Sequence, residues 1–220
     1  MGAEIPKQFI EVDGCPVIVY TFRAIERNPL INRIQVVCVA GWENTVAEYA
    51  QKFQLTKPFG IVTAGNTRYL STRRGMESLE GVADDDVIVV HDSVRPLVTA
   101  ESLTDTLDVC RRYGNAMSVI DCVDTMYERT ADGYTAREIN RAGMVRGQTP
   151  EAVTGRRMRE MYAASDAQNI RLDSVSALQL ALGWDIHFAK GSERNIKITR
   201  PEDIELFRAV VTSTKDVGKQ

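Results

Sequence analysis

The sequence predicts an α/β fold in which a mostly parallel sheet carries helices on both of its faces. Short β-branched runs alternate with amphipathic stretches along most of the 220 residues, as repeated strand–helix–strand units require. Because no linker-like segment divides the chain, we expect a single domain over residues 1–220. The alternation is broken once, at about 124–148, where a β-arm is predicted to project from the sheet.

The first half of the chain supplies most of this alternation. Its β-branched or apolar runs predict strands at 32–40, 59–64, 86–92 and 115–123. The amphipathic stretches between the strands predict helices at 43–53, 70–82 and 99–114. The last helix has the best-defined ends, since Thr99 is a favourable N-cap and Gly114 a favourable C-cap.

The arm at about 124–148 contains a hairpin signal. An Asp132-Gly133 turn joins two alternating stretches in TMYERTADGYTAREI. An arm of this kind needs a partner to cover it, and dimerisation of the chain is the simplest way to provide one. A solvated surface hairpin is the alternative that the sequence leaves open.

The segments after the arm return to the α/β pattern. They are predicted as helices at 150–165, 174–183 and 201–211, a strand at 185–191 and a frayed end at 212–220. The first of these helices is expected to begin with Pro150 at its first position, where the missing N–H of proline costs no hydrogen bond.

Composition and charge exclude several classes of function. The net charge of -3 argues against a nucleic-acid-binding surface, and no apolar run is long enough to span a membrane. No signal peptide is recognisable at the N-terminus, and the two histidines offer no zinc cluster, so we expect a cytoplasmic protein. The cysteines are far apart in apolar or amphipathic runs and are expected to be buried free thiols: Cys15, Cys38, Cys110 and Cys122.

Charged residues follow the strand at 86–92 at the point where it ends. In open α/β sheets, ligands bind outside the carboxyl ends of the strands, so Asp92 and Arg95 are candidates for a charged ligand or a metal ion. The alternative is a capping aspartate with a surface arginine, and the residues alone do not decide between them.

Lys197 lies between two isoleucines in an extended segment that precedes a helix. Strict alternation places Lys197 on the polar face with Asn195 and Thr199, where its ammonium could neutralise phosphate oxygens. An exposed edge-strand lysine that guards against aggregation is an equally good interpretation.

Two further loops could bind anions. Arg141 and Thr149 stand at the ends of a glycine-containing turn that leads into the predicted helix at 150–165, although an ordinary helix start explains them better. The loop at 63–75 carries Arg68 and has a glycine that lets backbone amides approach a base or phosphate. Lys7 gives no signal on its own.

Taken in order, six stretches resemble the cytidylyltransferases that act on polyol phosphates. They are PKQF, AGNTRYLS, VIVVHDSVRPLVT, VDTM, NRAGMVRGQTPEAV and ERNIKITRPEDI, and they extend from residue 6 to about 208. The family includes the 2-C-methyl-D-erythritol 4-phosphate enzyme of isoprenoid synthesis and the D-ribitol 5-phosphate enzyme of cell-wall polyol synthesis. The resemblance implies a Rossmann-like sheet, a dimerising β-arm and a homodimer.

The resemblance also implies a reaction. The phosphate of the substrate attacks the α-phosphorus of CTP and expels pyrophosphate. A phosphate monoester, whose second pKa is about 6, is already a nucleophile at neutral pH, so no side-chain base is needed. Two polyanions must meet, which requires cationic side chains and Mg²⁺ or another divalent cation.

Each motif implies roles for residues of this chain. Lys7 and Lys197 match lysines that contact the nucleotide phosphates, and Asp92 matches the acid beside substrate and metal. The residues that match or adjoin substrate contacts are Thr125, Arg141, Thr149, Arg95 and Asp173, with Arg141 reaching in from the partner's arm. The residues assigned to nucleotide binding are Gly65, Asn66, Arg68 and Ser71.

One departure from the family pattern leads to an alternative function. The family has a strand and a glycine-rich phosphate loop just before the PKQ motif, and Met1-Gly2 matches only the tail of that loop. The expectation is that the loop is absent and that CTP affinity and turnover fall. The alternative is therefore an impaired, truncated homologue that only binds sugar phosphate or dimerises; use of another nucleoside triphosphate is a third possibility.

Three residues slightly favour D-ribitol 5-phosphate as the polyol phosphate within this family. They are Trp42, Met144 and Gly147.

Overall fold

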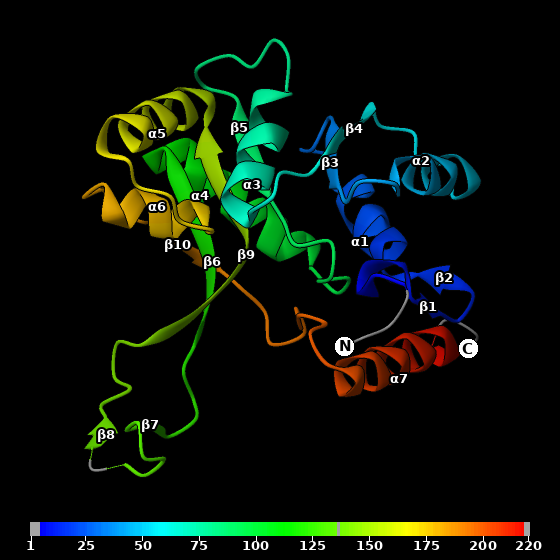
Figure 1. The fold of residues 1–220 in the computed structure, drawn as a ribbon. Coiled ribbons are helices and arrows are strands. Elements are labelled where there is room, and N and C mark those ends of the chain that lie inside the picture. The colour runs from blue at the N-terminus through cyan, green and yellow to red at the C-terminus, as the bar shows by residue number, and fades with distance from the viewer. Residues whose placement is uncertain (1–4, 136, 218–220) are drawn as a thin grey trace.

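The structure is a computed structural model that describes residues 5–135 and 137–217. Met1 and Gly2, which the sequence matches to the tail of a phosphate loop, lie outside the described residues, as do residues 218–220 of the expected frayed end. Figure 1 shows a body of sheets and helices from which one thin arm projects.

A four-stranded sheet in the order β10-β6-β9-β5 forms the centre of the body (Figure 1). Its strands are β5 (Val87–Val90), β6 (Asn115–Asp121), β9 (Val145–Thr154) and β10 (Phe188–Lys190). β10 is parallel to β6, and β9 is antiparallel to both β5 and β6, so β5, β6 and β10 run in one direction. A separate parallel pair consists of β3 (Ile34–Cys38) and β4 (Phe59–Thr63). The predicted α/β architecture is confirmed, with β9 as the reversed strand.

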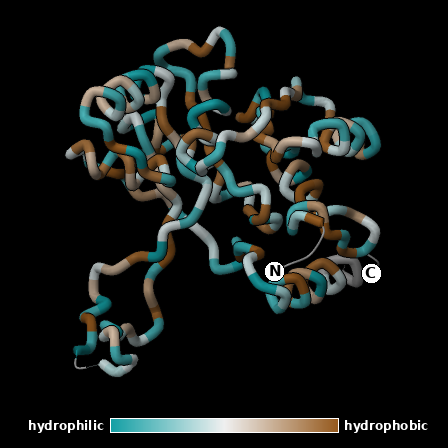
Figure 2. Tube along the Cα trace, viewed as in Figure 1, coloured by the Kyte–Doolittle hydropathy of each residue, from teal (hydrophilic) through white to brown (hydrophobic). Residues whose placement is uncertain are grey.

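Helices cover both faces of the central sheet because successive side chains along its strands point into two different cores. The helices are α3 (Arg68–Glu77), α4 (Ala100–Tyr113), α5 (Gly155–Gln168) and α6 (Val175–Ala181). Ala152 packs with Cys110 of α4, whereas its neighbour Val153 packs with residues of α3, α5 and α6. No helix in the described ranges is long and apolar enough to cross a membrane. Figure 2 shows apolar residues along both the strands and the helices of the body.

A second core joins the β3–β4 pair to the N-terminal segments. These are the 3-10 helix η1 (Lys7–Phe9), β2 (Cys15–Pro16), α1 (Val17–Glu26) and α2 (Glu43–Lys52). Strand β1 (Glu11–Val12) pairs with β2, and its Val12 belongs to the third core described below. Phe9 stacks on Trp42 with ring centroids 4.4 Å apart. The closing helix α7 (Pro201–Val217) packs on this side, where Phe207 shares a third core with Val94 and Ile198.

The predicted hairpin forms the arm seen in Figure 1. Strands β7 (Met126–Glu128) and β8 (Arg137–Ile139) pair in antiparallel register, and Gly133 has a φ of 86° at the turn. Val123 and Tyr127 are more than half exposed, at 62% and 56%. The arm therefore presents apolar side chains that the rest of the described chain does not cover.

The predicted helix at 150–165 is wrong in its first turn. Residues 145–154 form β9, the Thr149-Pro150 peptide is cis, and α5 begins only at Gly155 with Thr154 as its N-cap. The sequence signal was a proline at a helix start, but this segment pairs with strands on both sides, and that pairing outweighs local preference.

Smaller corrections concern other ends and one thiol. The helix predicted at 70–82 spans Arg68–Glu77, because Thr67 caps it earlier than expected. The end predicted to fray from 212 is helical to Val217. Cys122 is half-buried rather than buried, whereas burial raises the pKa of Cys38 to about 11 and of Cys110 to about 12.

Candidate active site

Asp92 lies at the centre of a cluster of three cations, directly after β5. Its Oδ1 accepts a hydrogen bond from Arg68 Nη2 at 3.0 Å. Its Oδ2 lies 3.0 Å from Lys197 Nζ and 3.4 Å from Arg95 Nε. The Asp92 side chain is only 14% exposed, so these contacts are formed largely away from solvent. We call Asp92, Arg68, Arg95 and Lys197 the Asp92 cluster.

Backbone hydrogen bonds bring Lys197 to Asp92 from a hundred residues away in sequence. The Ile198 N–H donates to the Val94 carbonyl at 2.9 Å, and both side chains are buried in the same core. Arg95 Nη1 donates to the Asn195 carbonyl at 2.7 Å. The segment before α7 is therefore held against the turn that follows β5, which places Lys197 over the carboxylate.

The expectation that Asn195 shares a polar face with Lys197 is wrong. Asn195 is fully buried, and its Nδ2 donates to the Thr149 carbonyl at 2.8 Å and to Gln148 Oε1 at 3.2 Å. The segment is extended but does not pair as a strand, so the alternation of a pleated strand does not apply. The edge-strand interpretation of Lys197 fails for the same reason.

Thr149 also belongs to this site, but not as a helix start. Its hydroxyl Oγ1 accepts a hydrogen bond from the Asp92 N–H at 3.1 Å, and the residue is buried in β9. The favoured interpretation of Thr149 as part of an ordinary helix start is wrong, and so is the alternative of an anion site at that helix N-terminus, because the helix begins only at Gly155, after the end of β9.

The cations of the cluster keep Asp92 ionised. Burial by itself would raise the pKa of the Asp92 carboxyl, but Arg68 and Lys197, with a smaller contribution from Arg95, hold it below its usual value. Burial lowers the pKa of Arg95, and Asp92 opposes that effect. The site thus holds one carboxylate and three positive groups, a net excess of positive charge suited to an anionic ligand.

His91 precedes Asp92 and is held neutral. Burial lowers the pKa of His91 to about 4, its Nε2 lies 3.2 Å from the Arg95 carbonyl, and its Nδ1 is buried with no hydrogen-bond partner among the described residues. A neutral imidazole next to the cluster adds no further positive charge.

The neutral state of His91 predicts an acid-sensitive fold. The folded-state pKa of about 4 lies below the ordinary 6.5, so the unfolded chain takes up the proton first as pH falls. The free energy of unfolding should therefore decline between pH 6.5 and 4, by up to about 3 kcal/mol. Denaturant unfolding of the wild type and His91→Asn at several pH values measures this; an equally steep decline in the variant would contradict it.

The loop at 63–75 is built around Gly65 and Ser71. The Gly65 N–H donates to Ser71 Oγ at 3.1 Å, and that hydroxyl lies 2.8 Å from the Thr67 carbonyl. A Cβ on Gly65 would lie 2.5 Å from Leu70 Cβ, so only glycine fits this turn. Asn66 is exposed at its tip. The loop leads directly into α3, whose first residue is Arg68.

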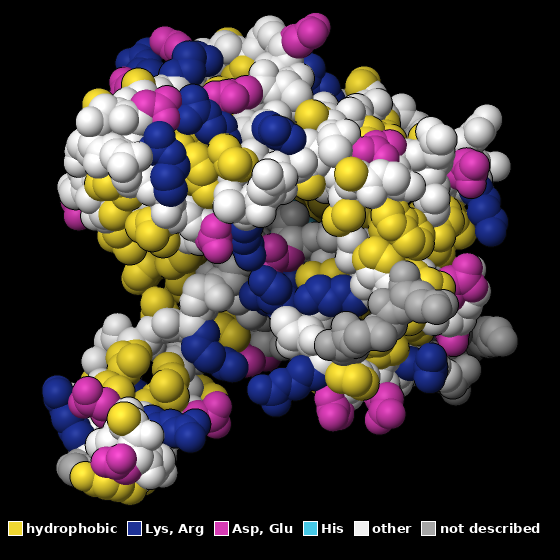
Figure 3. Space-filling model, in the orientation of Figure 1, with side chains coloured by type: hydrophobic (Ala, Val, Ile, Leu, Met, Phe, Trp, Pro, Cys, Tyr) yellow, Lys and Arg dark blue, Asp and Glu magenta, His cyan; other side chains and the backbone are white. Residues whose placement is uncertain are grey.

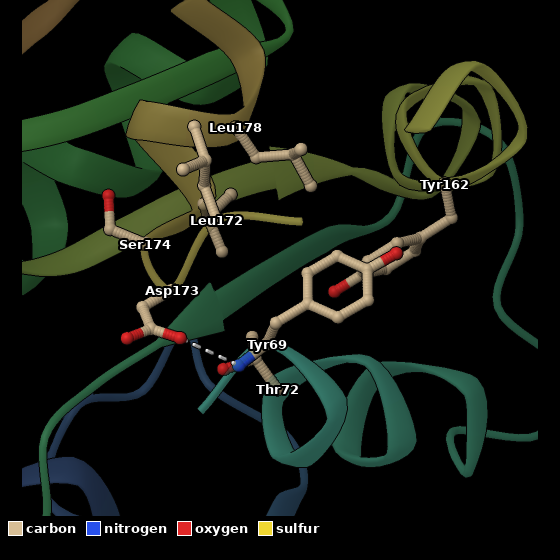
Figure 4. Close-up of a pocket in the computed structure, with 8 residues that line it drawn as sticks. Tyr69, Thr72, Tyr162, Leu172, Asp173, Ser174 and Leu178 are labelled. Atoms are coloured by element: carbon tan, nitrogen blue, oxygen red, sulfur yellow. Dashed lines mark hydrogen bonds between the residues drawn. The ribbon is translucent and has the colours of Figure 1, made fainter. Parts of the chain in front are cut away.

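Other predicted residues lie outside the cluster. Thr125 and Arg141 are exposed near the arm, where the Arg141 guanidinium donates to the Val123 carbonyl. Lys7 is half-buried in η1, and no contact within 5–135 and 137–217 joins its side chain to Asp92. Asp173 accepts a hydrogen bond from the Tyr69 N–H at 3.3 Å, in the crevice shown in Figure 4.

Sequence reasoning missed Glu151 and the role of Asn195. Glu151 is 6% exposed in β9, and its Oε2 accepts the Ser176 N–H at 3.2 Å. Burial raises the pKa of Glu151, while the Ser176 and Val175 amides and Arg68 act against this rise. The sequence offered little signal for this acid, because β9 (VRGQTPEAVT) is largely polar before it and Glu151 was interpreted as part of a first helical turn, where acids are ordinary.

One face of the molecule is hollowed and carries charged side chains. Figure 3 shows Lys and Arg side chains along the hollow in the middle of this face, with acidic side chains among them. No group of three or more His, Cys, Asp or Glu side chains within the described ranges could hold a metal ion. Any metal held here would need most of its ligands from a bound substrate or from water.

Comparisons with known proteins agree over nearly the whole chain. Residues 1–213 match the family model described as IspD: 2-C-methyl-D-erythritol 4-phosphate cytidylyltransferase. The chain is 33% identical to the ribitol-5-phosphate cytidylyltransferase of Lacticaseibacillus paracasei, over 95% of this chain and 91% of that protein. It is also 33% identical to the 2-C-methyl-D-erythritol 4-phosphate cytidylyltransferase of Syntrophus aciditrophicus, over 95% of this chain and 89% of that one.

Solved structures agree on the fold. The crystal structure of 4-diphosphocytidyl-2C-methyl-D-erythritolsynthase from Anaerococcus prevotii has a TM-score of 0.82 and 25% sequence identity, covering 96% of this chain and 92% of that one. The 2-C-methyl-D-erythritol 4-phosphate cytidylyltransferase of Thermus thermophilus, 24% identical, has a TM-score of 0.78 and covers 93% of each chain.

Proposed function

The chain belongs to the family of CTP-dependent 2-C-methyl-D-erythritol 4-phosphate and ribitol-5-phosphate cytidylyltransferases, and we propose that its polyol phosphate is D-ribitol 5-phosphate. The reaction transfers CMP from CTP and releases pyrophosphate. The choice rests on several ribitol-5-phosphate relatives, at 33%, 28% and 29% identity, and on Trp42, Met144 and Gly147, because the 33% identity to the Syntrophus aciditrophicus enzyme is as high as that to any of them.

One observation supports the assignment of the chemistry to the Asp92 cluster. A single buried carboxylate holds the Arg68 guanidinium and the Lys197 ammonium at 3.0 Å each, at the strand ends where α/β sheets bind ligands. Both cations can exchange Asp92 for phosphate oxygens without moving far. There they would offset the charge that builds up when the phosphate of the polyol attacks the α-phosphorus of CTP.

We further propose that Asp92 contributes to a Mg²⁺ site. Mg²⁺ is commonly held by one or two carboxylates together with substrate phosphates, and Asp92 is the carboxylate that this cluster provides. Both of its oxygens contact cations, so metal binding and release of Arg68 or Lys197 are expected to occur together. When bound, the metal would partly offset the negative charge of the triphosphate.

The substrate assignment can be tested with the purified chain. Pyrophosphate release would be measured with CTP and Mg²⁺ plus either D-ribitol 5-phosphate or 2-C-methyl-D-erythritol 4-phosphate. We expect kcat/KM for the ribitol compound to be about tenfold higher or more. Preference for the erythritol compound would overturn the choice of polyol. No detectable CTP binding and no release from either compound would indicate the impaired homologue that only binds sugar phosphate or dimerises, and UTP and GTP serve as nucleotide controls.

We also propose that the arm completes the site of a partner subunit in a homodimer. Val123 and Tyr127 give the arm an exposed apolar surface, and Arg141 lies at its base away from the Asp92 cluster of its own chain. A symmetric dimer would cover these side chains and could carry Arg141 to the partner's polyol phosphate.

Arg141→Ala is expected to raise KM for the polyol phosphate about tenfold or more, with CTP binding nearly unchanged. A mixture tests the subunit exchange. If Arg141 acts on the partner, dimers of Arg141→Ala with Lys197→Ala contain one intact site, and co-refolding equal amounts should restore about a quarter of wild-type activity. The assay uses polyol phosphate well below KM, where Arg141→Ala and Lys197→Ala each have low activity alone. Mixed dimers with no activity above that of the two variants alone would show that Arg141 does not act in the partner's site.

A further inference from the structure

We propose that Glu151 is a positioning residue for Arg68: by holding the start of α6, it keeps Asp173 on the first turn of α3 and thereby the Arg68 guanidinium on Asp92. The inference rests on the proposed function only for its kinetic consequence. The contacts themselves form a chain of described hydrogen bonds from β9 to the Asp92 cluster.

The first link joins β9 to α6. Glu151 lies between β5 and β6 in the sheet, opposite Val90 and Met117, and is 6% exposed. Its Oε2 accepts the Ser176 N–H at 3.2 Å. Ser174 caps the same helix by accepting the Ala177 N–H at 2.9 Å. Two side chains thus satisfy the amides at the start of α6, one of them a carboxylate anchored in the central strand.

The second link joins α6 to α3. Asp173 directly precedes the Ser174 cap, and its Oδ1 accepts the Tyr69 N–H at 3.3 Å (Figure 4). Thr67 satisfies the neighbouring Leu70 N–H at 3.1 Å. The first turn of α3 is therefore capped by its own threonine and by an aspartate from another element. Asp173 is exposed and stays in place only if the loop before α6 is fixed.

The third link joins α3 to the cluster. Arg68 is the residue before Tyr69, and its guanidinium lies 3.0 Å from Asp92 Oδ1. The Tyr69 ring is buried and its hydroxyl lies 2.8 Å from Ser165 Oγ, so the ring anchors the helix from below while Asp173 sets its first turn. Loss of the Asp173 contact would let the Arg68 end of the helix fray.

A purely structural role is the competing explanation, and a matched variant separates the two. Thr154 also lies in β9 and also caps a helix, since its side chain accepts the Arg157 N–H at the start of α5. It is the last residue of β9, five residues beyond Thr149, which contacts Asp92. Thr154→Ala therefore removes a cap of the same kind without touching the path to Arg68.

Hydrogen exchange of the substrate-free protein tests the positioning directly. In Glu151→Ala, the amides of residues 69–71 should exchange about tenfold faster, together with those at the start of α6. In Thr154→Ala, only the start of α5 should change. Unchanged protection at 69–71 in Glu151→Ala would overturn the proposal whatever the protein catalyses. Because this measurement needs no substrate, it remains decisive even if the proposed activity fails.

Kinetics supply the second readout. We expect Glu151→Ala to lower kcat/KM per folded enzyme about tenfold. The kcat/KM of Glu151→Gln should lie within about threefold of the wild-type value, because its amide oxygen can accept the same N–H. The kcat/KM of Thr154→Ala should match that of the wild type. Equal losses in Glu151→Ala and Thr154→Ala would show a general effect of stability. If Glu151→Ala does not fold, Asp173→Ala cuts the exposed link, and normal protection of residues 69–71 in that variant would also overturn the proposal.

Discussion

Replacing Asp92 by Asn is expected to lower kcat/KM by about 100-fold or more and to destabilise the fold by about 3 kcal/mol. The variant keeps the shape of the side chain but removes the one negative charge that Arg68, Arg95 and Lys197 share. Arg95 is only 12% exposed, so its charge would be left largely buried beside two others. Steady-state pyrophosphate release and denaturant unfolding measure the two effects.

Asp166→Asn is the matched control for this variant. Asp166 also binds two arginines, with Arg73 at 2.8 Å and Arg171 at 2.9 Å, but its side chain is 45% exposed. An exposed carboxylate of this kind should contribute little to stability, and its loss should leave kcat unchanged. Equal destabilisation by Asp92→Asn and Asp166→Asn would show that burial of the Asp92 cluster does not matter.

Replacing Lys197 by Ala is expected to separate catalysis from folding. We expect kcat to fall about 100-fold or more because the variant removes a positive group that would stabilise developing phosphate charge. The melting temperature should change by only about 2 °C, since Lys197 is 32% exposed and Asp92 keeps Arg68 and Arg95 as partners. Turnover and thermal unfolding of the same preparation provide the comparison.

Lys190→Ala is the control for this second variant. Lys190 lies seven residues earlier, and its Nζ contacts Glu101 Oε1 at 2.6 Å on an exposed surface. Its loss should affect neither turnover nor melting. A large drop in melting temperature for Lys197→Ala would mean that the lysine is part of the scaffold, and a normal kcat would remove it from the catalytic machinery.

The elements with strong local signals were predicted well. The helix at 99–114 has its ends where Thr99 and Gly114 placed them, because a side-chain cap and a left-handed glycine act within a few residues. The Asp132-Gly133 turn correctly predicted the hairpin of the arm, because a turn signal also acts within a few residues. The segment at 145–154 was mispredicted because its strand state depends on β5 and β6, which the local sequence does not contain.

The candidate site divides in the same way. The sequence by itself determined which residue types were available: Asp92 and Arg95 after an apolar strand, Lys197 between two isoleucines, and a glycine loop before Arg68. Only the tertiary structure decided that these side chains meet on one carboxylate, and that Glu151 and Asn195 are buried among them. The physical reason is that these contacts depend on how the turn after β5 packs against the segment before α7, through the Ile198–Val94 hydrogen bond and a shared apolar core. Packing between residues so distant in sequence leaves no periodic or local pattern in the chain.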